Sequence, residues 1–191
     1  MRHELIEFPK RDGLPMGGLC SEVGRDIVAA SYRRGDFVLP SGEHSKFYFD
    51  TYLFETKPTI LRRIADRIAM ELPSRVDRVA GTDGGGVALA TAVSLATGLP
   101  FVIIRPTKEF QVRGELYKGE RVAVLTDVVD SGEHATAAAT RVSAAGAEVV
   151  VVISVIDRDA GAPRRLRSAG LQYRSLYRLQ DLGIDEEQWN G

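Results

Sequence analysis

Residues that could contact a ligand lie at the ends of three apolar runs of the sequence. The first group is the glycine-rich segment 81–86, GTDGGG. The second is Asp127 with the neighbouring run Asp130-Ser131-Gly132, and the third is the pair Asp157-Arg158. Glycine lets the backbone approach a ligand closely, and the first turn of a helix offers free N–H groups to an anion. The three segments therefore predict a binding site for an anionic ligand such as a phosphate.

Each segment also has a purely structural interpretation. The glycines could form a flexible turn, Asp130 or Ser131 could cap the helix that follows, and Arg158 could be solvated. In the functional interpretation the Asp130 segment is a phosphate cradle, Asp127 lies near sugar hydroxyls or a metal, and Arg158 holds a planar anion in bidentate fashion. Ligands of open α/β sheets collect beyond the carboxyl ends of the strands, so all three segments are expected on one rim.

The elements that position these segments alternate between strand and helix. Strands are predicted at 78–81, 100–105, 121–129 and 148–157, a short strand in the tail, and helices at 87–98 and 135–147. The predicted strands are apolar throughout, which is typical of a parallel sheet covered by helices on both faces. The sequence therefore predicts an α/β fold with a mostly parallel, twisted sheet flanked by helices.

The amino-terminal part has a different pattern. A helix is predicted from Leu19, with Ser21 as its cap and Gly35 as its stop, because apolar residues recur at spacings of three and four. Two short strands are predicted within 37–54 around a Pro-Ser-Gly turn. A second helix is predicted to open at Pro58 and to end before Pro73.

Composition excludes several classes of protein. The 25 Lys and Arg residues nearly balance the 26 Asp and Glu residues, so the chain has no basic footprint for nucleic acid. Its single cysteine, Cys20, excludes an internal disulfide framework. No apolar run approaches the roughly 20 residues that span a bilayer, and the amino end lacks the apolar core of a signal peptide. We expect a cytoplasmic protein without nucleic-acid or membrane partners.

Four segments, in this order, resemble those of type I phosphoribosyltransferases, most of all orotate phosphoribosyltransferases. SGEHSKFYFD resembles the family's Ser-Gly-Arg-x-Ser-x-Tyr-Phe segment, which packs over the base, and GTDGGGVALATAVS resembles the pyrophosphate loop and its helix. VLTDVVDSG stands where the family carries its phosphoribosyl-pyrophosphate signature, and VISVIDRDAG resembles the strand whose arginine meets orotate. The agreement of order and spacing is more specific than any one motif.

The resemblance implies a magnesium-dependent reaction in which orotate displaces pyrophosphate from 5-phosphoribosyl 1-pyrophosphate and gives orotidine 5′-monophosphate. By position, it implies catalytic roles for Asp127, Lys108 and Arg113. It implies substrate binding by Ser45, Tyr48, Phe49, Gly84, Gly85, Gly86, Arg105, Asp130, Ser131, Gly132 and Arg158. Lys108 and Arg113 fall where the family has a mobile loop that reaches the neighbouring subunit, so a homodimer is implied. The three scattered histidines predict no metal cluster.

The expected organisation is an N-terminal arm over residues 1–18, followed by a single phosphoribosyltransferase-like domain over 19–191. Within that domain we expect a small hood at about 19–57 and a core at about 58–182.

Departures from the family pattern fall on the chemistry. Thr126 replaces the first of two adjacent acids, while Asp130 and Glu133 place carboxylates beside the phosphate cradle; Pro40 and Pro106 stand where lysines are usual. Like charges about 4 Å apart repel by about 4 kcal/mol at an effective dielectric near 20. Three hypotheses stay open: an orotate-type transferase, a transferase for a different base, and a non-catalytic, ligand-sensing or regulatory protein on the same fold.

Overall fold

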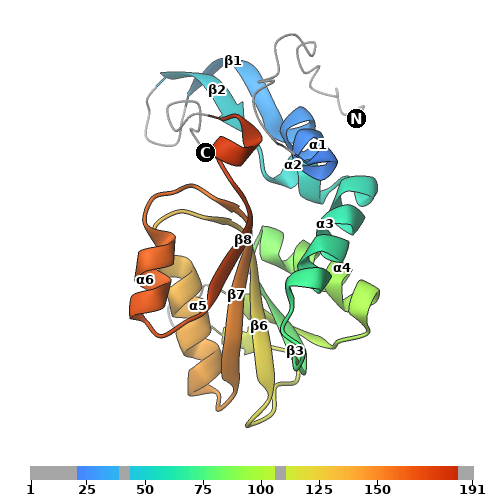
Figure 1. The fold of residues 1–191 in the computed structure, drawn as a ribbon, viewed down its shortest axis with the longest axis vertical. Coiled ribbons are helices and arrows are strands. Elements are labelled where there is room, and N and C mark those ends of the chain that lie inside the picture. The colour runs from blue at the N-terminus through green and yellow to red at the C-terminus, as the bar shows by residue number, and fades with distance from the viewer. Residues whose placement is uncertain (1–20, 39–43, 106–110, 185–191) are drawn as a thin grey trace, which may run out of the picture.

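The computed structural model describes residues 21–38, 44–105 and 111–184 (Figure 1). A six-stranded sheet forms its centre, in the spatial order β5-β4-β3-β6-β7-β8. All neighbouring strands are parallel except β4 and β5, which are antiparallel. The strands are β3 (Arg78–Thr82), β4 (Phe101–Arg105), β5 (Gln111–Arg113), β6 (Arg121–Val129), β7 (Glu148–Asp157) and β8 (Tyr173–Arg178). The predicted α/β class is confirmed.

Helices cover both faces of this sheet (Figure 1). The helices α3 (Pro58–Glu71) and α4 (Gly85–Thr97) lie on one face, and α5 (Glu133–Ala144) and α6 (Ala162–Ser168) lie on the other. The central strands are therefore buried on both sides, which explains why β6 and β7 are apolar almost without interruption. The helix α4 ends as predicted, because Gly98 adopts the left-handed conformation at its C-cap, with φ 77°.

A smaller layer precedes the core in the chain and lies above it in Figure 1. It contains α1 (Glu22–Ser31), the antiparallel pair β1 (Tyr32–Val38) and β2 (His44–Phe49), and the single turn α2 (Tyr52–Glu55). Ser21 caps α1 as predicted, since its hydroxyl accepts a hydrogen bond from the Gly24 N–H at 3.3 Å. The Ser21 hydroxyl also lies 2.6 Å from the Tyr177 hydroxyl of β8, which ties this layer to the core sheet.

Three predictions of local structure are wrong. Gly35 does not stop the first helix; α1 ends at Ser31, and Gly35 lies inside β1. The second strand ends at Phe49, and the residues predicted to continue it form α2, where Asp50 Oδ1 accepts a hydrogen bond from the Tyr52 N–H at 3.0 Å. Residues 111–113 form strand β5 rather than part of a loop, because they pair with the edge of β4.

The remaining predictions for this part of the chain lie outside the described residues. They concern the arm over residues 1–18, Cys20, Pro40, Pro106 and Lys108. Within the described ranges, no helix combines the length and apolarity needed to cross a membrane.

Candidate active site

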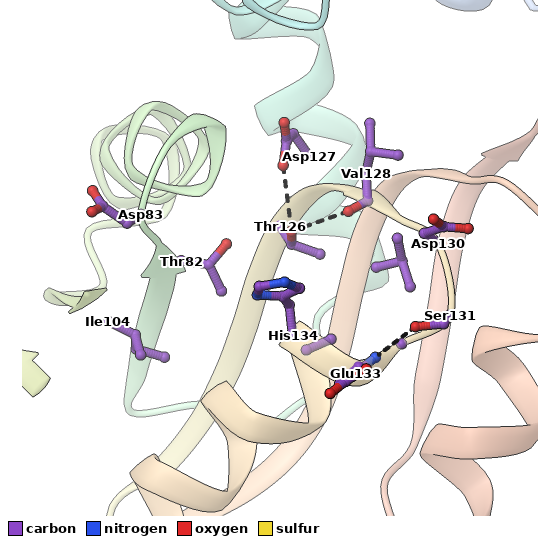
Figure 2. Close-up of a pocket in the computed structure, with 13 residues that line it drawn as sticks. Thr82, Asp83, Ile104, Thr126, Asp127, Val128, Asp130, Ser131, Glu133 and His134 are labelled. Atoms are coloured by element: carbon purple, nitrogen blue, oxygen red, sulfur yellow. Dashed lines mark hydrogen bonds between the residues drawn. The ribbon is translucent and has the colours of Figure 1, made fainter. Parts of the chain in front are cut away.

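The order of strands reverses between β3 and β6. The chain proceeds outward from β3 to β4 and β5, and then from β6 in the other direction to β7 and β8. Open α/β sheets bind ligands in the crevice at such a reversal. A cavity of about 230 Å³ lies there, lined by Thr82, Asp83, Ile104 and all residues of the segment 126–135 (Figure 2). Two of the three predicted segments thus contribute to one pocket, whereas Asp157 and Arg158 do not line it.

The glycine-rich loop joins β3 to α4 beside this pocket. A Cβ added to Gly81 would lie 2.2 Å from the Gly86 carbonyl oxygen, and one added to Gly86 would lie 2.6 Å from Thr82 Oγ1. Glycine is therefore required because the strand, the loop and the first turn of α4 touch one another. Gly84, Gly85 and Gly86 follow Asp83 directly but do not themselves line the cavity.

The turn before α5 forms the opposite wall. Gly132 is the N-cap residue of α5 with φ 81°, a conformation that favours glycine, and a Cβ there would lie 3.1 Å from Ala162 Cα. The N-cap residue is Gly132, which has no side chain, rather than Asp130 or Ser131. The Ser131 hydroxyl still accepts a bond from the Glu133 N–H at 3.4 Å. Helix N-terminal N–H groups lack intrahelical partners, so this turn can bind an anion.

Asp127 lies between the two walls (Figure 2). Its Oδ1 is 3.4 Å from the hydroxyl of Thr126, which is buried and also points toward the Val128 carbonyl. Thr126 therefore offers a hydroxyl to Asp127, whereas an acid at position 126 would repel the Asp127 carboxylate. His134, in the first turn of α5, faces the same cavity.

Arg158 is held at the end of β7 by its backbone. Its N–H donates to the Val129 carbonyl at 2.9 Å, and the next N–H, of Asp159, donates to Asp157 Oδ1 at 2.9 Å. Burial raises the pKa of Asp157. The guanidinium of Arg158 pairs with Asp130, with 3.4 Å between Nη1 and Oδ2. Asp130 therefore neutralises the arginine instead of capping the helix.

The pocket is acidic. Asp83, Asp127, Asp130 and Glu133 line it, and the described residues of its lining include no Lys or Arg. Arg105 reaches Asp83 at 3.8 Å from outside the lining set, across an exposed pair. Arg158 likewise pairs with Asp130 from outside the lining set, so two arginines offset part of the negative charge of the pocket. Among the described residues, no cluster of three His, Cys, Asp or Glu residues could hold a metal.

The predicted base-contacting residues lie on β2. Tyr48 is half-buried, and its ring lies against that of Phe37, tilted by 34° with 5.6 Å between the ring centroids. Phe49 is 2% exposed and belongs to the hydrophobic core, so it does not face the pocket. The backbone of Ser45 pairs with Phe37 across the two strands.

Arg113 is not brought to the pocket. It lies on edge strand β5, where its Nη2 donates to Gln111 Oε1 at 2.6 Å, and it lines a separate cavity of about 440 Å³ together with Arg141. Lys108, the other catalytic residue predicted in this segment, lies outside the described residues.

Two residues near the site were missed by the sequence analysis, both on α2. The Tyr52 hydroxyl lies 3.7 Å from the position of a Cβ on Gly84, and the side chain is 60% exposed. Glu55 is buried, and a Cβ on Gly85 would lie 1.8 Å from its Oε1. The only signal in the sequence was Pro58, which predicts a helix start nearby but does not reveal a preceding helical turn.

The fold recurs in phosphoribosyltransferases. The adenine phosphoribosyltransferase of Leishmania donovani superposes with a TM-score of 0.69 at 20% identity, covering 90% of this chain and 85% of that one. The orotate phosphoribosyltransferase of Mycobacterium tuberculosis, in complex with 5-phospho-α-D-ribosyl 1-diphosphate, gives a TM-score of 0.70 at 28% identity, covering 85% and 98%. The pocket and the sheet thus define a type I phosphoribosyltransferase.

Sequence similarity narrows the class further. The orotate phosphoribosyltransferase of Methanocella arvoryzae is 39% identical over 153 residues, which are 78% of this chain and 87% of that relative. The chain matches no protein-family model. It belongs to the orotate phosphoribosyltransferase family.

Proposed function

We propose that this protein transfers the phosphoribosyl group of 5-phosphoribosyl 1-pyrophosphate to orotate. A ring nitrogen of orotate forms a bond to the anomeric carbon while the bond from that carbon to pyrophosphate breaks, giving orotidine 5′-monophosphate. The supporting observation is the pocket at the strand reversal, where Asp127 faces the N-terminal turn of α5, in a member of this family.

The protein has little covalent chemistry to perform in such a reaction. It must hold two anionic ligands in line and stabilise positive charge on the ribose ring. Ser131 and Gly132, at the start of α5, bind the 5′-phosphate through hydroxyl and N–H groups. Asp127 accepts hydrogen bonds from the ribose hydroxyls and stabilises the developing oxocarbenium charge. Pyrophosphate lies by the start of α4, where Gly84 leaves room for it, while Gly85 and Gly86 pack against Glu55 and Thr82.

The base binds between Arg158 and the β1–β2 layer in this proposal. Arg158 exchanges its Asp130 partner for the carboxylate of orotate, a bidentate ligand of matching shape. Tyr48, rather than the buried Phe49, supplies the aromatic contact. Roles in binding or catalysis for Ser45, Arg105, Lys108 and Arg113 stay predictions.

Magnesium fits this site only as part of the substrate complex. Mg²⁺ keeps several waters and binds through one or two carboxylates together with substrate phosphates. The described residues offer no metal cluster of their own, but Asp83 lies at the cavity and can contact a hydrated ion through water. The ion would neutralise charge on pyrophosphate as it leaves.

We also propose a homodimer in which the segment containing Lys108 and Arg113 serves the neighbouring subunit. Arg113 lies on an edge strand and does not line the pocket of its own chain, which supports this arrangement. Mixing two inactive variants, Arg113→Ala and Asp127→Asn, should restore part of the activity, because mixed dimers keep one intact site. Absence of any recovery, with mixed dimers present by mass spectrometry, would contradict the proposed homodimer.

A cytoplasmic location stays a prediction.

The direct test is turnover of orotate with phosphoribosyl pyrophosphate and Mg²⁺. Turnover is measured as release of pyrophosphate and as loss of orotate absorbance. We expect saturable turnover in the wild type and at least about a 100-fold lower kcat in Asp127→Asn. Asp66→Asn, an exposed change on α3, is the matched control. Adenine, guanine and uracil in place of orotate test the alternative base.

The acidity of the pocket favours a second candidate, a non-catalytic sensor on the same fold. Asp130 and Glu133 would weaken the binding of a doubly charged phosphate. Calorimetry with phosphoribosyl pyrophosphate and Mg²⁺ at millimolar concentration, repeated at several temperatures, distinguishes the two. Turnover with any base would remove the sensor hypothesis. Titrations that release no heat at any temperature, together with the absence of turnover, would overturn the transferase hypothesis.

A further inference from the structure

Glu55 is a buried acid that the chemistry described above does not use. It is the last residue of α2, is 5% exposed and does not line the pocket. Among the described residues its Oε1 has no hydrogen-bond partner. A charged carboxylate without a partner is costly to bury, so the surroundings of this group must favour its neutral form.

One side of the Glu55 carboxyl packs against the pyrophosphate loop. Oε1 would lie 1.8 Å from a Cβ on Gly85, and the whole carboxyl group would lie within 2.7 Å of it. The carboxyl therefore fills the space that any side chain at residue 85 would need. Glu55 and Gly85 form one packing unit, which connects α2 with the first turn of α4.

The other side of the carboxyl faces acids. Asp127, on β6, is within hydrogen-bonding contact of it, and Asp50, which precedes α2, adds negative potential. Two carboxyl groups can share a hydrogen bond only when one of them carries a proton. Burial first, and then the neighbouring Asp127 and Asp50, together raise the pKa of Glu55 to about 8. Glu55 is therefore the protonated donor near neutral pH, and Asp127 is the acceptor.

We propose that Glu55 is a positioning residue, which donates a hydrogen bond to Asp127 and fixes that carboxylate toward the ribose site while packing under the pyrophosphate loop at Gly85. Asp127 is then held from two directions, by Thr126 at 3.4 Å and by Glu55. The arrangement needs a neutral partner, because a second charge beside Asp127 would push the carboxylate away. This inference rests on the proposed function, since it concerns the same site.

Kinetics of Glu55 variants in the full chain test the positioning role. Glu55→Ala should lower kcat at pH 7 by about 10- to 100-fold, the cost of a misplaced catalytic group. Glu55→Gln retains the donor and should restore kcat to within a few-fold of wild type. In the wild type kcat should fall as pH rises through about 8, whereas Glu55→Gln should show no such fall. The exposed Glu148→Gln at the start of β7 is the control.

A structural readout separates failure of this inference from failure of the proposed function. The Glu55 side-chain carboxyl is titrated by carbon-13 NMR in the wild type and in Asp127→Asn, without any substrate. We expect the midpoint near 8 in the wild type and a lower midpoint in the variant, because the Asp127 charge is gone. An ordinary midpoint in the wild type, or an unchanged one in the variant, would overturn the inference. So would the same alkaline fall of kcat in Glu55→Gln as in the wild type.

Discussion

The guanidinium of Arg158 lies 3.4 Å from the carboxylate of Asp130, measured from Nη1 to Oδ2. Arg158 follows β7 and Asp130 follows β6, so the pair bridges the carboxyl ends of two neighbouring strands. In the proposed function the carboxylate of orotate binds this same guanidinium, which Asp130 occupies here. The carboxylates of Asp130 and of orotate would then compete for the guanidinium of Arg158.

Asp130→Asn should therefore strengthen the binding of orotate. The variant removes the competing charge but keeps the size of the side chain. Because the Asp130 carboxylate is exposed, an ion pair of this kind contributes at most about 1 kcal/mol, and we expect KM for orotate to fall about two- to fivefold. The difference should shrink in high salt, since salt screens exposed charges. Equal KM values in the two proteins at low salt would show that Arg158 does not hold the base.

Asp130→Thr combined with Glu133→Gly should strengthen the binding of phosphate at the start of α5. Both acids line the pocket, and their removal lowers repulsion of a doubly charged group. We expect the Kd for inorganic phosphate to fall at least about tenfold, which is about 1.4 kcal/mol. Calorimetric titration of the wild type and the double variant with inorganic phosphate measures the two Kd values. No gain, or a loss, would show that the two carboxylates face away from the ligand.

Gly85→Ala should destabilise the protein through Glu55 in particular. The added methyl group would meet Oε1, and overpacking of this kind costs about 1–3 kcal/mol. Adding Glu55→Ala to that variant should recover part of the lost free energy of unfolding, measured in urea. Gly86→Ala is the matched control, because its methyl group would meet Thr82 Oγ1 and the Leu125 carbonyl instead. If Glu55→Ala rescued both glycine variants equally, the specific contact would be disproved.

The stability of the wild type should decrease with rising pH because of Glu55. The folded state raises the pKa of this group from 4.5 to about 8, so its stabilising contribution is complete below 4.5 and is lost as pH rises through 8. Relative to Glu55→Gln, the free energy of unfolding of the wild type should fall by about 2–4 kcal/mol between pH 5 and pH 8. Parallel urea titrations at both pH values measure the difference. Identical pH dependence in the two proteins would contradict the neutral buried state.

The central strands could be predicted because each one appears in the sequence as an apolar run, which reflects its burial on both faces. The apolar runs 121–129 and 148–157 match β6 and β7, since a strand covered on both faces has no polar side. The edge strand β5 could not be predicted, because three residues that pair on one side only leave no apolar run. Likewise α2 is too short for a helical period, and its single turn follows an Asp50 side-chain bond rather than an amphipathic pattern.

The order of the elements and the ligand-facing turns after β3 and β6 could be predicted from the chain alone, because strand ends and glycine turns are encoded by residues close together in sequence. The roles of the charged groups depend instead on contacts that form only on folding. Asp130 pairs with Arg158, and Glu55 meets both Gly85 and Asp127, across separations of 28 or more residues. The protonation state of an acid depends on burial and on neighbouring charges, and both exist only once the chain has folded.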